Sequence, residues 1–116
     1  NQPKGSEKDE LEKNSIHVWV CENSKVLGVG RGHFNSKDDA QIRYMAVDEN
    51  YQSKGIGSII LKELEKKLKE RGAKSIILNS RESAINFYKN NGYKIVGEAP
   101  TLFGVIRHFK MLKKIG

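Results

Sequence analysis

The sequence predicts an α+β domain in which helices flank a mixed, mostly antiparallel sheet. Three features of the residue pattern favour this class. Apolar residues alternate through residues 15–47, a stripe with a period of nearly four follows over residues 56–71, and short β-branched runs return after it. The implied order is β-β-β-α-β-α-β-β, and such an order places the helices on one sheet.

The size and charge of the chain limit what it can be. It has 116 residues and a formal net charge of +7 at pH 7. We expect one domain over residues 15–116, preceded by a polar tail at residues 1–14, where apolar side chains are almost absent. No apolar run reaches the roughly 20 residues of a membrane-spanning helix and no leader pattern opens the chain, so we expect a cytoplasmic protein without a membrane partner. The positive charge requires an anionic partner of some kind.

The first two strands are expected to form a hairpin. Residues 15–20 (SIHVWV) and 25–34 (KVLGVGRGHF) are rich in β-branched side chains, and Asn23 and Ser24 between them are turn-forming residues. Cys21 continues the first run, so we expect it to be a small buried residue rather than a nucleophile.

A third strand is expected to lead into an amphipathic helix. Residues 40–47 (AQIRYMAV) follow a polar break, and short links between consecutive strands favour antiparallel pairing. The helix should end after Arg71, because Gly72 is the residue expected in a left-handed conformation just past a helix C-terminus. Its apolar stripe consists of Ile56, Ile60, Leu61, Leu64 and Leu68.

The remaining elements alternate again between strand and helix. We expect a buried strand, a second helix closed by Asn91 and Gly92, and two final strands separated by a break at residues 98–101 (EAPT). The ranges are 74–79 (KSIILN) for the strand, 81–90 (RESAINFYKN) for the helix, and 93–97 and 104–112 for the last two strands.

Two glycines, Gly55 and Gly57, stand where the third strand gives way to the helix. Backbone N–H groups at a helix start lack partners and lie at the positive end of the helix dipole, so they attract phosphate. An ordinary tight turn is the alternative. The run GIGSII lacks the third glycine of a dinucleotide-binding motif, and the glycine-rich run at 28–32 (GVGRG) lies inside a strand, where we expect a feature such as a bulge.

Two separate motifs make the sequence similar to a known family. The run QSKGIG at residues 52–57 matches the pattern Q/R-x-x-G-x-G/A after a strand, and the run NSRESAINFYKNNGYKIVGE at residues 79–98 matches a strand-Asn followed by A-x-x-F-Y-x-x-x-G-Y/F. In this order they resemble the GNAT family of N-acetyltransferases, from about residue 15 to the end of the chain. The resemblance implies the acyl-CoA N-acyltransferase fold in an N-terminally short form.

The resemblance also implies a cofactor, acetyl-CoA. In the family, the glycine turn wraps the pyrophosphate with backbone amides and the preceding strand pairs with the pantetheine arm. No metal is implied. The cofactor-binding residues carried over to this sequence are Met45, Ala46, Val47, Gln52, Ser53, Lys54, Gly55, Ile56, Gly57, Ser58, Asn79, Phe87 and Lys89.

The implied reaction is direct attack of a primary amine on the thioester, without a covalent enzyme intermediate. The family's FY tyrosine, here Tyr88, would protonate the departing thiolate, although packing in the core is its alternative role. Many members carry a glutamate on the strand before the turn, where this sequence has Gln41 and Arg43. His108 is therefore the expected base or water relay, with a plain surface histidine as the alternative. Weaker candidates, which would bind a substrate carboxylate, are His33, Arg43 and Arg81.

One departure from the family leaves other functions open. Members usually have a strand and one or two helices before the hairpin, and only about 15 polar residues precede it here. Either the sequence is a processed or excised segment, or the acceptor wall comes from elsewhere, for instance a second copy in a homodimer. A non-catalytic acyl-CoA sensor is the first alternative to an enzyme acting on a small-molecule or peptide amine. A small basic nucleic-acid-binding domain is the weaker alternative, because the cations are interleaved with acids and no reader motif occurs.

Overall fold

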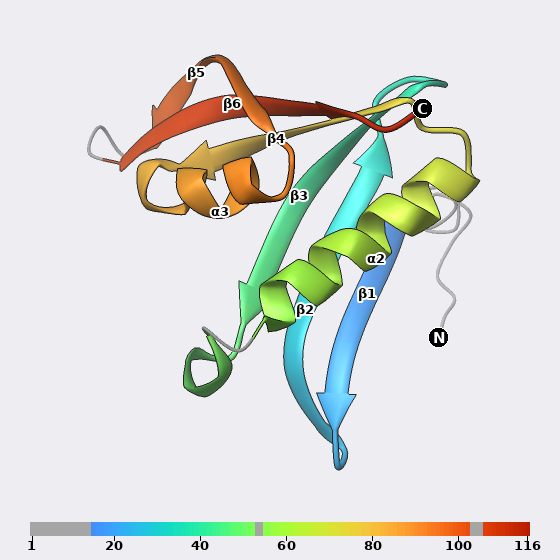
Figure 1. Ribbon diagram of the computed structural model, residues 1–116, viewed down its shortest axis with the longest axis vertical. Coiled ribbons are helices and arrows are strands. Elements are labelled where there is room, and N and C mark those ends of the chain that lie inside the picture. The colour runs from blue at the N-terminus through green and yellow to red at the C-terminus, as the bar shows by residue number, and fades with distance from the viewer. Residues whose placement is uncertain (1–14, 53–54, 103–105) are drawn as a thin grey trace, which may run out of the picture.

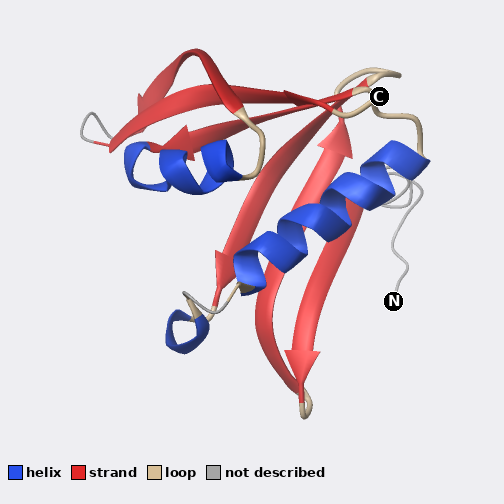
Figure 2. Ribbon diagram, viewed as in Figure 1, coloured by secondary structure: helices blue, strands red, loops and turns tan. Residues whose placement is uncertain are grey.

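The computed structural model describes residues 15–52, 55–102 and 106–116. They form one six-stranded sheet with the strand order β1-β2-β3-β4-β6-β5, in which only β3 and β4 are parallel (Figures 1 and 2). The expected α+β class with a mixed, mostly antiparallel sheet is confirmed. The elements are β1 Ser15–Glu22, β2 Lys25–Phe34, β3 Asp39–Val47, the 3₁₀ turn η1 Glu49–Tyr51, α2 Ile56–Glu70, β4 Ser75–Arg81, the 3₁₀ turn η2 Glu82–Ala84, α3 Ile85–Asn90, β5 Lys94–Leu102 and β6 Ile106–Lys114.

The expected hairpin of β1 and β2 is present. Its turn residues Asn23 and Ser24 have φ values of 50° and 70°, and positive φ at both positions is the geometry of the type I′ turn that matches the twist of paired strands. The expectation that Cys21 is buried was wrong, since its side chain is exposed. A register shift between Val20 and Cys21 changes the alternation there, and the hairpin tip extends past the start of α2 (Figure 1). Nothing covers Cys21 among the described residues.

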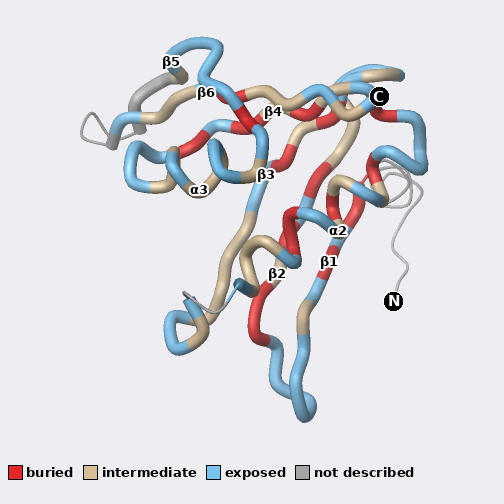
Figure 3. The backbone as a smooth tube through the Cα atoms, viewed as in Figure 1, coloured by how far each residue is buried: buried red, intermediate tan, exposed pale blue. Residues whose placement is uncertain are grey.

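The hydrophobic core lies between α2 and the sheet (Figure 3). The glycines of β2 let the helix come close. A Cβ atom on Gly28 would lie 2.6 Å from Ile60 Cδ1, and one on Gly30 would lie 2.6 Å from Ile60 Cγ2 and 2.9 Å from Leu64 Cδ1. Residues two apart on a strand are separated by about 6.7 Å, and residues four apart on a helix by about 6 Å. The spacing of the glycines of β2 therefore matches the spacing of the apolar residues of α2. The run GVGRG therefore serves helix packing.

The C-terminal ends of the two helices agree with the sequence. Gly72 follows α2 with φ +106° and Gly92 follows α3 with φ +95°, the left-handed conformation expected just past a helix end. The α3 segment is shorter than expected, because residues 82–84 form a 3₁₀ turn before it.

The expected break at residues 98–101 was wrong. β5 continues through it to Leu102, with a register shift between Ala99 and Leu102. β5 is an edge strand of the sheet. An edge strand tolerates proline because one side of its backbone needs no partner, so Pro100 does not end the strand.

Candidate active site

The site begins where two parallel strands separate. Residues 39–41 of β3 pair with residues 75–77 of β4, and among the described residues no pairing joins the two strands beyond Gln41 and Ile77. Figure 1 shows the strands running apart from this point. One edge of β3 from Ile42 to Val47 is therefore left without a strand partner, while its other edge pairs with β2. We call this the β3–β4 divergence.

A bulge in β3 accompanies the separation. Arg31 pairs with Tyr44 and Gly32 pairs with Ile42, so Arg43 is an extra residue with no partner on β2. The bulge expected within the glycine-rich run of β2 is thus on the partner strand. Because a bulge bends its strand, its position next to the last β3–β4 pair explains why the two strands separate there.

The other end of the β3–β4 pair is held together by side chains. The Asp39 carboxylate accepts hydrogen bonds from Ser75 Oγ at 2.7 Å and from Ser36 Oγ at 3.0 Å. These bonds, led by that from Ser75, lower the pKa of Asp39. The Lys74 backbone N–H also donates to Asp38 O at 2.7 Å. The two strands are therefore held together at the Asp39–Ser75 end of the pairing and separate beyond Gln41 and Ile77.

The glycine turn lies at the end of the free edge of β3. Gln52 Nε2 donates to Val47 O at 3.2 Å, which ties the turn to the strand. Gly55 is the N-cap of α2 with φ +82°, and its carbonyl accepts the first helical bond from Ile59 N–H at 3.1 Å. The next amides, those of residues 56–58, have no acceptor within α2 because they belong to its first turn. Two of the predicted cofactor residues, Ser53 and Lys54, lie outside the described residues.

The second glycine of the turn has a packing role. A Cβ atom on Gly57 would lie 3.3 Å from Phe87 Cζ and 3.9 Å from Val47 Cγ2. A Cβ atom on Gly55 would meet nothing within 4 Å. Gly55 is thus required for its left-handed backbone, whereas Gly57 lets α3 dock against the turn. The structure therefore brings Phe87, Gly57 and Val47 together.

The side chain of Tyr88 on α3 contacts β3. Its hydroxyl donates to Met45 Sδ at 3.9 Å, and its ring packs edge-on against Phe87 and Tyr93 at centroid distances of 5.0 and 5.8 Å. Burial raises the pKa of Tyr88. The hydroxyl therefore keeps its proton throughout the neutral range and can donate it. The contact with Met45 places this donor at the β3–β4 divergence.

A partly buried polar cluster, which the sequence analysis missed, fixes α3 relative to α2. Glu65 on α2 accepts from Tyr93 Oη at 2.9 Å and from Lys113 Nζ at 3.0 Å, and Lys113 also donates to Asn91 O at 2.9 Å. Burial and the adjacent Glu65 charge raise the pKa of Tyr93. The signal in the sequence is a glutamate beside Leu61, Leu64 and Leu68 on the apolar stripe. A charged residue on such a stripe needs a partner.

Two predicted residues lie on the strands beyond the divergence. Asn79 is exposed on β4 opposite Lys110 of β6, and half-buried His108 lies on β6 opposite Arg81 of β4. The structure thus places Asn79 and His108 on neighbouring strands and the same face. Lys89 is exposed in α3, two residues and therefore about 200° around the helix from Phe87, so the contact with the glycine turn does not include it.

The weaker candidates are dispersed. His33 is half-buried on β2 opposite Gln41, and its Nδ1 lies 3.3 Å from Phe34 O. Arg43 is exposed at the bulge. Gln41, on the strand where the family resemblance predicts a glutamate, accepts a hydrogen bond from Asn35 Nδ2 at 2.9 Å. Its neutral amide orients neighbours and cannot take up a proton.

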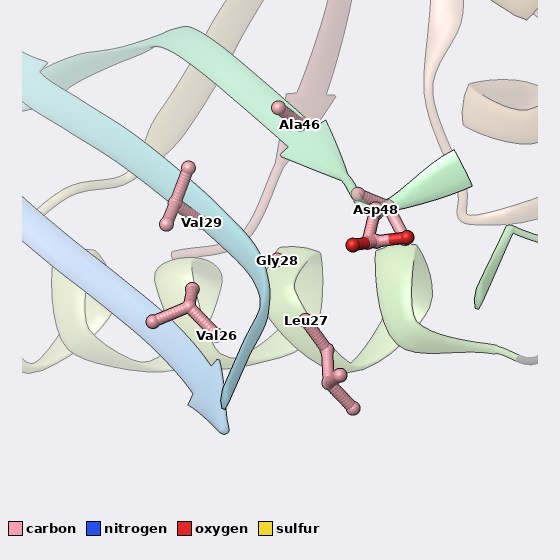
Figure 4. Close-up of a pocket in the computed structure, with 7 residues that line it drawn as sticks. Val26, Leu27, Gly28, Val29, Ala46 and Asp48 are labelled. Atoms are coloured by element: carbon pink, nitrogen blue, oxygen red, sulfur yellow. The ribbon is translucent and has the colours of Figure 1, made fainter. Parts of the chain in front are cut away.

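A hollow of about 280 Å³ lies at the start of β2 and the end of β3 (Figure 4). It is lined by the ends of β2 and β3, mostly by apolar residues, and by Asp48. The Asp48 carboxylate accepts from Asn50 N–H at 2.8 Å and lies 3.8 Å from Lys25 Nζ. A carboxylate at its rim repels phosphate, so we do not assign the hollow to a cofactor.

Metal-ligand clusters and membrane-spanning helices are both absent from the described part of the chain. Residues 15–52, 55–102 and 106–116 contain no group of His, Cys, Asp and Glu side chains that could hold a metal ion. No helix within the same ranges has the length and apolar character needed to span a membrane.

Comparison with known proteins identifies the family. The model of the acetyltransferase (GNAT) family matches residues 2–93. The uncharacterized N-acetyltransferase YjcF of Bacillus subtilis (strain 168) is 38% identical over 114 residues, which cover 97% of this chain and 80% of that protein. The chain belongs to the acetyltransferase (GNAT) family, and its class of reaction is acyl transfer.

Solved structures show the same fold. An acetyltransferase from Bacillus cereus aligns with a TM-score of 0.80 and 22% identity, over 99% of this chain and 96% of that one. A GNAT family acetyltransferase from Elizabethkingia anophelis, solved with acetyl-CoA bound, aligns with a TM-score of 0.80 and 17% identity, over 97% of this chain and 84% of that one. These neighbours have the mixed sheet and helices described above.

Proposed function

We propose that this chain binds acetyl-CoA along the β3–β4 divergence and transfers its acetyl group to a primary amine by direct attack. One observation carries the proposal. The backbone amides at residues 56–58, which begin α2, lie near Val47, at the end of the β3 edge that has no strand partner among the described residues. A helix N-terminus binds phosphate and an unpaired strand edge binds an extended chain, so the two features together suit a phosphorylated pantetheine arm.

The residues present fit this cofactor. Gly55 has open space where any other side chain would project, and its left-handed backbone sets the direction of the amides of residues 56–58. The main chain of Met45, Ala46 and Val47 would pair with the pantetheine arm. Phe87 supports the turn from α3, and Gln52 holds it to Val47. The remaining proposed cofactor residues are Ser53, Lys54, Asn79 and Lys89.

Acyl transfer needs two proton movements. Bound acetyl-CoA would supply the thioester: the amine nitrogen bonds to the carbonyl carbon, the C–S bond breaks, the amine loses a proton and the sulfur gains one. We assign the second proton to Tyr88 Oη, whose raised pKa keeps it protonated. We assign removal of the first proton to His108, acting directly or through water, because an imidazole can act as a general base and His108 lies on the same face as Asn79 on the neighbouring strand.

A calorimetric titration with CoA, followed by a transfer assay, tests the proposal. We expect CoA to bind, and CoA thiol to be released from acetyl-CoA when primary amines are added. If no CoA binding is detected with the folded protein, the proposal is wrong and the roles given to Asn79, Tyr88 and His108 lose their basis.

A non-catalytic acyl-CoA sensor is the second candidate, and Gln41 favours it. Where many family members have a glutamate, this neutral side chain is engaged by Asn35. The same experiment separates the two candidates. CoA binding without thiol release above the water background, across a panel of amines, would replace the enzyme by the sensor.

A further inference from the structure

Four polar side chains form a block on the face of the sheet opposite α2. Along β4, Asn79 and Arg81 are exposed, whereas Ser80 between them is buried. On β6, Lys110 lies opposite Asn79 and His108 lies opposite Arg81. Directly opposed side chains share a face and have Cβ atoms about 5 Å apart, while diagonal neighbours such as Arg81 and Lys110 are about 7–8 Å apart.

The two cations of this block, Arg81 and Lys110, lack a counter-charge among the described residues. Neither the Arg81 guanidinium nor the Lys110 ammonium has an ion pair or side-chain hydrogen bond to another described residue. Glu82 follows Arg81 in the chain but forms no ion pair with it, and Glu98 on β5 is engaged by Arg107 at 3.1 Å. Neighbouring like charges destabilise a sheet, so an anion bound between Arg81 and Lys110 would remove an unfavourable interaction.

The block borders the β3–β4 divergence. Asn79 and Arg81 lie on β4 just beyond Ile77, the last residue that pairs with β3. On the other strand, the exposed Arg43 is the extra residue of the bulge. An amine that enters from this face to reach the divergence would pass the cation of Arg81, which has no ion pair to another described residue.

We propose that the acceptor amine carries an anionic group, a carboxylate or a phosphate, and that Arg81 and Lys110 bind it and so determine acceptor specificity. This inference rests on the proposed acetyl transfer. An arginine binds either group through two parallel hydrogen bonds, and a lysine adds a point charge that suits both. If the acceptor carried no anionic group, the guanidinium of Arg81 and the ammonium of Lys110 would stay next to each other without a counter-charge. The enzyme should therefore discriminate through acceptor binding and leave the chemical step unchanged.

Two pairs of amines test the proposal and distinguish carboxylate from phosphate. ε-Aminocaproate is compared with its amide, and phosphoethanolamine with ethanolamine. We expect kcat/KM for the anionic member of at least one pair to exceed that of its neutral partner by about tenfold, the ratio given by 1.4 kcal/mol of binding. Arg81→Gln and Lys110→Gln should each remove most of this preference through a higher KM. The neutral partner should be unaffected.

Lys69→Gln, in the last turn of α2, is the matched control with the same change in charge, and it should keep the preference. Calorimetry of the anionic amine with the CoA complex gives a readout independent of turnover. Failure of CoA to bind would contradict the proposed function itself. If CoA binds but anionic and neutral amines bind and react equally, or if the variants affect both members alike, the acceptor proposal is wrong while acetyl transfer stands.

Discussion

The two ends of α2 provide a controlled test of the phosphate-binding turn. Gly55 before the helix and Gly72 after it both have positive φ, +82° and +106°. At neither position would a Cβ atom meet another atom within 4 Å. Substitution by alanine at either glycine therefore adds backbone strain without a clash.

The two variants should lose similar stability. The left-handed conformation costs a residue with a Cβ atom about 1–2 kcal/mol. With a urea m-value of about 1.5 kcal/mol per molar, the denaturation midpoint should fall by about 1 M in Gly55→Ala and in Gly72→Ala alike.

Their CoA affinities should differ. Relief of the strain at Gly55 rotates the amides that follow it, whereas relief at Gly72 acts at the opposite end of the helix. Loss of one hydrogen bond to a charged phosphate costs about 1.5–3 kcal/mol, so calorimetry should give a Kd about 10- to 150-fold weaker for Gly55→Ala. Gly72→Ala should bind as the unmodified chain does. An unchanged Kd for Gly55→Ala, or an equal loss in both variants, would refute the role of the turn.

Three further changes test the packing and the chemistry. Gly30→Ala places a Cβ atom 2.6 Å from Ile60 Cγ2 and should lower the free energy of unfolding, measured in urea, by about 1–3 kcal/mol. Gly97→Ala, whose Cβ atom would meet nothing within 4 Å, should leave the free energy of unfolding nearly unchanged. Equal effects of the two variants would contradict the close approach of α2 to β2. Tyr88→Phe should lower kcat by about 10²-fold or more at an unchanged Kd for CoA, and a normal kcat would exclude Tyr88 as the donor. Stability should fall above about pH 10, because unfolded tyrosines lose their protons there while the raised pKa values of Tyr88 and Tyr93 keep them protonated in the folded chain. Urea melts at pH 9 to 11 should show a smaller fall in Tyr93→Phe, and an identical slope would contradict this account.

The sequence alone determined the local elements and the type of turn. The period-four stripe marked α2, Gly72 and Gly92 marked the helix ends, and Asn23 with Ser24 marked the hairpin. These features are local, because each depends on residues a few positions apart and on backbone preferences that hold in any fold. The same is true of the glycine at position 55, whose left-handed φ follows from the strand-to-helix turn that contains it.

The tertiary structure decided which residues meet. The close approach of α2 to Gly28 and Gly30 was not visible in the strand, because a glycine in a strand signals a bulge as readily as a packed helix. The edge position of β5 let a strand pass through Pro100, and the bulge at Arg43 separated β3 from β4. Such features depend on strand order and register, which are set by the burial of side chains far apart in the chain. The sequence thus named the residues that we assign to the cofactor, and only packing placed Tyr88 beside Met45 and aligned the cations of β4 and β6.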